Sequence, residues 1–598
     1  MRLPSATLRR QQLLVLGCLL LGGLILRVAH LWALRQDILF EYPPLDADRY
    51  IQTARTLAAT GHDEPGIYWQ PPGFQLLLAL LFRVAGPGLL VPRLLHVLAS
   101  LGCVVLVFLL GRRVFSPALA LAAAGILAFH GVFLHGTLEL LPTVWVAFFD
   151  LLGLLLLYVA TERASWPRAL GAGVALGISA VFRPVILAFV PLAFLFLWKA
   201  PVRRGLLVGL FAVGILLPIA PVTVRNYRVG KEFVLISSNG GLNFYLGNNA
   251  RSEETLSVRP GRHWQEITSE PRRAGVRGVN AASLYFYRKA WDFIKASPGK
   301  AMTNMARKLY LYFNGWEIPR DGDIYAEREV SRVLKATVLG EPFPFPNGVL
   351  LPLALLGVLL AWQQRHRGGL LAAYVAVQAV VTAAFFVTSR YRVPVTPVLA
   401  LFAAFGAACL GSTLRQRKQK TIAVLLPTLG ALLVVLNLPT RERKISYAAE
   451  LAFYRGVAYR FSIGDPAKAA LHFREAARMD PNDGRAYFEL GNSLADLGRD
   501  EEAFEVWDRA AKADPTNPWP RRKAAMHAAR RGDRPRAIRF LQESLAAPKA
   551  DRSEQARDYL FLGQLLQQNG DAAAALEAFR AAKALDPRLP APVPSAGP

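Results

Sequence analysis

The amino-acid sequence predicts an all-α protein in two parts. Residues 1–440 are expected to form a bundle of membrane-spanning helices, and residues 448–587 a solenoid of helical repeats. The chain of 598 residues is 53% hydrophobic. Its long apolar runs are confined to the first part and approach the ~20 residues that a helix needs to cross a bilayer. In the second part the dipeptide Asp-Pro recurs from Asp480 to Asp514, a period of 34 residues within an alanine-rich helical pattern.

Apolar runs in the first part predict about eleven membrane-spanning helices. Their ranges are 13–33, 91–111, 117–135, 139–159, 168–182, 184–199, 205–221, 347–363, 369–388, 393–411 and 421–438. A further run, 73–85, has only 13 residues and predicts a helix that lies in the membrane interface.

Part of the formal charge of +27 is explained by the membrane reading, because many cations stand at the ends of apolar runs. We expect no nucleic-acid partner, since no nucleic-acid-binding motif accompanies the charge. If the N-terminus is cytoplasmic, five short cytoplasmic loops are rich in Lys and Arg while the short external connections hold few, as the positive-inside rule requires. Arg441, Arg443 and Lys444 argue the other way. The five loops outweigh them and predict a multi-pass inner-membrane protein whose loops 34–90 and 222–346 and whose C-terminal repeats are extracytoplasmic.

The first external loop holds an acidic pair, Asp46 and Asp48, at the start of a predicted helix that runs to about Ala59 and ends at Gly61. Either Asp can cap this helix, and capping alone would explain the pair. The loop continues with an aromatic and proline cluster over residues 68–74, which would return the chain to the membrane surface.

A carboxylate pair outside the first span, then a short helix and Pro-Pro, resembles the active-site loop of GT-C glycosyltransferases. More narrowly, it resembles the family of protein O-mannosyltransferases and lipid A aminoarabinose transferases. The matching residues are Asp46, Arg49, Tyr50, Pro71 and Pro72. Similar segments lie at 238–249 and 389–394. The aminoarabinose branch has a Lys before Pro-Pro where this chain has Gln70, which puts that branch's substrate in doubt.

The resemblance implies transfer of a sugar from a polyprenyl-phosphate donor to an acceptor hydroxyl by a single inverting displacement. Asp46, with Asp48 beside it, is then the candidate general base. Arg183, Arg390 and Arg392, all on the external side of the predicted topology, are candidates for binding the donor phosphate, which the planar donor fork of Arg suits. The sequence leaves open whether a divalent metal takes part, because the histidines are too scattered to name as ligands.

Four further residues are candidates for substrate binding, each with a plain structural alternative. Tyr50 belongs to the family motif. Glu139 would be costly if it faced lipid, but it can equally lie at the water interface. Asn243 and Asn248 stand in a glycine- and asparagine-rich stretch that can also be an ordinary turn.

The C-terminal part resembles tetratricopeptide repeats in its 34-residue period and in the glycine near position eight of a unit, such as Gly491 and Gly563. Four such repeats predict a concave surface for a protein or glycan partner, although a passive stabilising cap is the plain alternative. The Pro- and Ala-rich tail 588–598 predicts disorder.

Two other function classes compete with the transferase. A transporter or flippase of lipid-linked material should show broken spans or paired internal repeats, and the sequence shows neither clearly. A non-catalytic, membrane-anchored repeat scaffold would not need eleven spans or an acidic external loop.

Overall fold

The structure is a computed structural model that describes residues 6–256, 262–320, 322–363, 367–440, 447–546 and 552–589. Every regular element in these ranges is a helix. The chain divides into two compact units, Met1–Lys444 and Ile445–Pro598, which confirms the predicted all-α fold in two parts. Of the predicted tail, residues 590–598 lie outside the described residues, as do the three basic residues 441, 443 and 444.

Helices long and apolar enough to cross a membrane form the core of the first unit. By length and composition these are α1 (Ala6–Leu34), α4 (Leu90–Val114), α7 (Thr143–Arg163), α10 (Arg204–Gly230) and the continuous run Ser389–Arg415, in which α21 (Ser389–Arg392) leads through a 3₁₀ turn into α22 (Thr396–Arg415). Shorter apolar helices include α8 (Trp166–Phe182), α19 (Asn347–Gln363), α20 (Gly369–Ala384) and α23 (Gln419–Val435). Each predicted span falls on an apolar helix, while the number of spans stays a prediction.

One predicted span is bent. The run 117–135 is split into α5 (Pro117–Phe129) and α6 (Gly131–Leu138), which meet at 55°. His130 stands at the break, and its side chain accepts a hydrogen bond from the Phe133 amide, so it caps α6. This break was not predicted, because a histidine inside an apolar run carries no helix-breaking signal of its own.

Close backbone contact between α8 and α10 accounts for part of the glycine content of the first unit. A methyl group added at Gly173 would lie 2.2 Å from the Phe211 carbonyl oxygen on α10, so only glycine permits this approach. α10 also continues to Gly230, past the predicted end at residue 221, with Pro218 and Pro221 inside it. Neighbouring helices permit such prolines in membrane helices.

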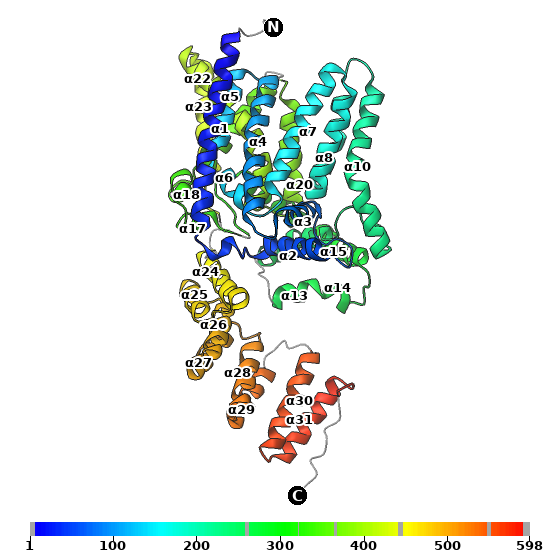
Figure 1. Cartoon of the computed structure of the whole chain (residues 1–598), viewed down its shortest axis with the longest axis vertical. Helices are drawn as coiled ribbons and strands as arrows, with labels where there is room; N and C mark the ends of the chain where they lie inside the picture. The colour runs from blue at the N-terminus through cyan, green and yellow to red at the C-terminus, as the bar shows by residue number, and fades with distance from the viewer. Residues whose placement is uncertain are drawn as a thin grey trace. The chain divides into compact units, whose positions relative to one another are not determined.

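Short helices from the two long connections gather at one end of this bundle, opposite to the start of α1 (Figure 1). The first connection supplies α2 (Leu45–Thr60) and α3 (Gly73–Ala85). The second supplies α11 (Gly240–Gly247), α12 (Ser252–Leu256), α13 (Arg262–Thr268), α14 (Glu270–Arg273), α15 (Val279–Ala296), α16 (Pro298–Phe313), α17 (Ile324–Glu327) and α18 (Arg332–Thr337). α2 packs through Ala47, Tyr50, Ile51 and Ala54 against α3, the spacing of an apolar helix face.

In the second unit, helices pair in chain order. The described helices are α24 (Tyr447–Val457), α25 (Pro466–Met479), α26 (Gly484–Asp496), α27 (Asp500–Ala513), α28 (Trp519–Arg530), α29 (Arg534–Leu545), α30 (Arg552–Gln568) and α31 (Ala572–Leu585). The turns inside the first three pairs hold Gly464, Gly498 and Gly532, all with positive φ. Their spacing repeats the 34-residue period, and the left-handed backbone explains why glycine is used there.

Candidate active site

Asp46 lies in the first turn of α2, next to a strained residue. The residue before the helix is Pro44, which provides no side-chain cap, and both Asp46 and Asp48 stand inside the first turn. The expectation that one of them caps the helix is therefore wrong, whereas Gly61 does end it in the left-handed conformation. Leu45 has φ = 61°, which costs a non-glycine residue about 1–3 kcal/mol and is typical of functional sites.

The Asp46 carboxylate is fixed by two side chains from distant parts of the chain. Its Oδ2 accepts a hydrogen bond from Arg390 Nη1 at 2.8 Å, which is also an ion pair. Its Oδ1 accepts from Gln70 Nε2 at 2.8 Å. The Asp46 side chain still keeps 34% of its surface exposed. Gln70, which stands where the aminoarabinose branch has a Lys, thus donates a hydrogen bond to the Asp46 carboxylate.

Burial and charge act on Asp46 in opposite directions. Burial raises the pKa of the Asp46 carboxyl, but Arg390, with a further contribution from Arg320 and Gln70, outweighs it, so the pKa lies below its ordinary value. The group is therefore ionised at neutral pH and can accept a proton.

Asp48 has a different environment from Asp46, two residues away. It is exposed, and its Oδ1 accepts a hydrogen bond from Gln52 Nε2 on the same helix at 3.0 Å. The two members of the acidic pair thus lie on different faces of the helix. Only Asp46 forms an ion pair with a cation from another segment.

Arg183 and Tyr391 stand beside Arg390. Arg183, between α8 and the following 3₁₀ turn, lies with its guanidinium carbon 3.7 Å from the centre of the Tyr391 ring. The corresponding distance from Arg390 to the same ring is 5.2 Å. Arg183 Nη1 also donates to the Arg390 carbonyl oxygen at 3.5 Å. Arg183 and Arg390 thus lie close together around the Tyr391 ring, and paired guanidinium groups favour an anionic ligand.

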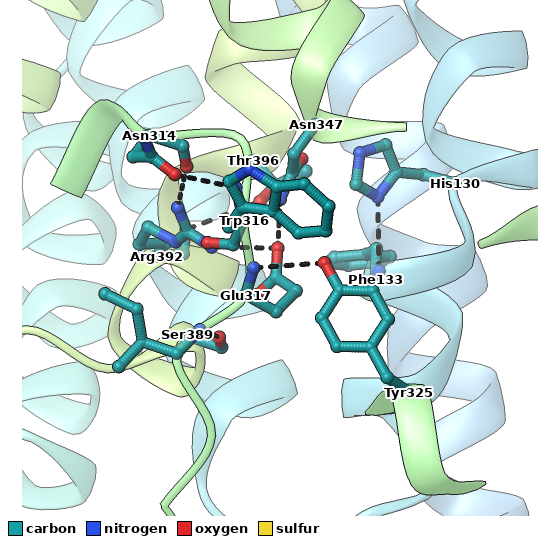
Figure 2. A network of polar contacts seen from close by, with 11 residues as sticks. His130, Phe133, Asn314, Trp316, Glu317, Tyr325, Asn347, Ser389, Arg392 and Thr396 are labelled. Carbon is teal, nitrogen blue, oxygen red and sulfur yellow. Dashed lines mark hydrogen bonds and ion pairs between the residues drawn. The ribbon is translucent and has the colours of Figure 1, made fainter. Parts of the chain in front are cut away.

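Arg392, the third predicted donor-binding arginine, lies in another network. It is only 4% exposed and forms an ion pair with Glu317 at 2.8 Å. Its Nη1 and Nη2 donate to the Asn314 and Trp316 carbonyl oxygens. Figure 2 shows Glu317 between Arg392, Asn347 and Tyr325. The structure does not bring Arg392 to Asp46, because its guanidinium is occupied by these buried acceptors.

Glu139 is close to the site, together with residues that the sequence reading had not assigned to it. It follows the last residue of α6. His135 Nε2 lies 3.6 Å from Glu139 Oε1, and His135 Nδ1 lies 3.3 Å from Glu327 Oε2. Glu139 also lies near enough to Arg390 for their charges to interact. No sequence signal links Glu327 to His135, because Glu327 belongs to α17 in the second long connection.

The other predicted substrate-binding residues have packing roles or lie elsewhere. Tyr50 is 5% exposed, and its ring meets that of Phe74 edge to face. Asn248 donates to the Phe244 and Ala384 carbonyl oxygens and accepts from Lys308 Nζ. Asn243 is half-buried on α11, and no interaction joins it to Asp46. Among the described residues, no group of three or more His, Cys, Asp or Glu could hold a metal ion.

Comparison with known families agrees with this division of the chain. Residues 69–224 match the family model of dolichyl-phosphate-mannose-protein mannosyltransferase. Residues 458–518 and 556–589 match tetratricopeptide repeat models. The first match supports a membrane glycosyltransferase. The other two support a repeat region suited to protein–protein interaction.

The range that matches the mannosyltransferase model includes Gln70, Glu139 and Arg183 but neither Asp46 nor Arg390. A comparison with curated proteins found no match. Similar solved structures include a crystal structure of MamA, at 18% identity and a TM-score of 0.21, covering 23% of this chain and 79% of that one. MamA 41-end from Desulfovibrio magneticus RS-1 gives 18% identity and a TM-score of 0.21, covering 30% and 93%. The CopN-Scc3 complex gives 17% and 0.18, covering 21% and 72%.

Proposed function

We propose that the first unit transfers a sugar from a polyprenyl-phosphate carrier to an acceptor hydroxyl in one inverting displacement. The observation that carries the proposal is the Asp46 carboxylate, held by Arg390 and Gln70 beside Arg183. This arrangement places a proton acceptor next to two cations, as the reaction requires at its attacking and leaving oxygens.

In the proposed step, the acceptor oxygen bonds to the anomeric carbon while the bond from that carbon to the phosphate oxygen breaks. The hydroxyl proton passes to Asp46. The electron pair leaves with the phosphate, and Arg183 and Arg390 stabilise its charge. Arg390 carries the planar donor fork of a guanidinium and places one donor on Asp46.

An assay of the purified full-length protein tests this function. The protein is incubated with a panel of polyprenyl-phosphate sugars and a generic hydroxyl acceptor, and release of polyprenyl phosphate and formation of inverted product are followed. We expect turnover with at least one lipid-phosphate sugar and none with the matching nucleotide sugar. Turnover of the nucleotide sugar alone would overturn the proposed donor class.

The bent α5–α6 pair favours one other candidate function, a flippase of lipid-linked sugar, because broken spans are typical of transporters. Reconstituted vesicles distinguish the two functions. A flippase moves the lipid-linked sugar across the bilayer with no new glycosidic bond, whereas the proposed transferase forms product without net movement.

We propose that the site and the repeats face the extracytoplasmic side of the cell membrane. Single cysteines are introduced and treated with a membrane-impermeant thiol reagent on intact cells, after permeabilising any outer membrane. We expect labelling at positions 62, 255 and 485 and protection at positions 166 and 417. Protection of position 485 alone would place the repeats in the cytoplasm and leave the site assignment unchanged.

We propose that the repeats hold an acceptor or partner protein near the membrane and take no part in the chemistry. Removal of the chain after Thr440 is then expected to leave transfer to a small acceptor largely intact and to slow transfer to the native partner, because tethering raises local concentration. The cut keeps residues 436–438, which bind the segment 314–316. Equal losses on both acceptors would show that the repeats support the fold instead.

A further inference from the structure

The helix that carries Arg390 is too short to hold itself in place. α21 has four residues, Ser389–Arg392, which is about one turn. Residues two apart on a helix point away from each other. Arg390 accordingly reaches Asp46, while Arg392 reaches into the protein toward Glu317. Besides its continuation into α22, the orientation of α21 therefore depends on contacts on the side away from the candidate site.

The hydrogen bonds and the ion pair on that side come from residues 314–318. The Ser389 amide donates to the Ile318 carbonyl oxygen at 2.9 Å, and Ser389 Oγ accepts from the Ile318 amide at 2.7 Å. Arg392 donates to the Trp316 carbonyl oxygen at 3.0 Å and pairs with Glu317 Oε1 at 2.8 Å. Together these bonds fasten both ends of α21 to one extended segment.

The segment 314–318 is itself held firmly. The Gly315 amide donates to the Leu436 carbonyl oxygen at 2.7 Å, and the Trp316 indole donates to the Asn437 carbonyl oxygen at 3.0 Å. Trp316 is only 1% exposed. The end of α23 thus supports this segment, which can serve as a fixed reference for α21.

Glu317 is the charged centre of the arrangement. It is 2% exposed, and besides Arg392 it accepts a hydrogen bond from Asn347 Nδ2 on α19, while its amide donates to Tyr325 OH (Figure 2). A buried ion pair is a poor source of stability compared with apolar packing, and fixing one arrangement is the better-attested use of such groups. Here the arrangement fixed is that of the helix carrying Arg390.

We infer that Glu317 is a positioning residue of the transferase: through Arg392 it holds α21 so that Arg390 stays on Asp46. The inference rests on the proposed function for its kinetic consequences. Its structural content, that loss of Glu317 loosens Arg390 from Asp46, can be measured without turnover.

The test is Glu317→Gln in the full-length protein, which keeps the shape of the side chain and removes its charge. We expect kcat to fall by roughly ten-fold to a hundred-fold, the usual result of misplacing a group by ~1 Å, with the acid limb of the pH–rate profile moved to higher pH. The sign follows because Asp46 works when ionised, Arg390 favours ionisation, and burial opposes it. The groups that face Asp46 are Arg390, Arg320 and Tyr50, and Glu139 faces Arg390; only Arg390 lies on the helix that Glu317 holds.

A direct titration of Asp46 gives the readout that needs no activity. Infrared difference spectra of each variant against the same variant with Asp46→Asn give the protonation midpoint of Asp46. We expect a higher midpoint in Glu317→Gln than in wild type. The matched control, Ser331→Ala, removes another buried polar contact of the same unit, the 2.9 Å contact with His30 Nδ1, and should leave the midpoint unchanged.

A second variant covers the case in which Glu317→Gln does not fold. Ser389→Ala removes the acceptor for the Ile318 amide without leaving a buried charge, and it should move the Asp46 midpoint in the same direction by less. An unchanged midpoint in every folded variant of this network overturns the inference. If wild-type protein transfers no sugar from any donor, the proposed function fails, while the infrared midpoints still decide the role of Glu317.

Discussion

Asp46→Asn is expected to abolish sugar transfer while the protein stays folded and inserted. The substitution keeps the side-chain shape and a carbonyl oxygen for Arg390, and it removes only the proton acceptor. Loss of a general base costs about 10²–10⁴ in rate. The measurement is kcat with the best polyprenyl-phosphate donor, together with the thermal unfolding midpoint, which should change little compared with the loss of activity.

Asp48→Asn is the matched control for this prediction. It changes the same residue type one half-turn away, on an exposed side chain whose partner is Gln52, and it should retain most activity. Full activity of Asp46→Asn with loss in Asp48→Asn would exchange their roles. Full activity in both variants would remove the loop from the mechanism.

The pH dependence of the wild-type enzyme follows from the same contacts. Because Arg390 holds the pKa of Asp46 below its ordinary value, transfer should persist as the pH falls through the range where a free aspartate becomes protonated. The activity that depends on ionised Asp46 is therefore present at neutral pH and is lost only below its lowered pKa. An acid limb near neutral pH would contradict the pairing seen here.

The overall architecture could be predicted because its signals are local and repeated. Apolar runs located the membrane helices, and the 34-residue period located the repeats, since both patterns recur along the chain. The bend at His130 and the extension of α10 past Pro221 were missed. Both depend on how neighbouring helices pack, and the hydrophobic periodicity of one segment does not predict that packing.

The candidate site was predictable in its residue types but only in part in its geometry. Position outside a span singled out Asp46, Arg183 and Arg390, and the structure brings these three together. The Asp46–Arg390 pair joins residues far apart in sequence, and a single sequence carries no measure of such pairing. For the same reason Arg392 could not be distinguished from Arg390, although Arg392 binds the buried Glu317.

Neutral replacement of Arg390 should have the second-largest effect on transfer. Arg390→Met removes a cation that both fixes Asp46 and, in the proposed step, stabilises the leaving phosphate. Removal of one such stabilising donor costs about 10²–10³ in kcat. Arg390→Lys keeps the charge but lacks the planar fork, so it should recover only part of the activity.

A second consequence of Arg390→Met separates its two roles. Without the guanidinium, burial acts on Asp46 with less opposition, so its pKa should rise and the acid limb should move to higher pH. The matched control is Arg83→Met on α3, an exposed arginine that donates to the Ala58 carbonyl oxygen, and its profile should match wild type. A loss of kcat with an unmoved acid limb would assign Arg390 to the phosphate alone. Wild-type kcat in Arg390→Met would remove it from the site, because a cation this close to the base cannot be lost silently if both act in one step.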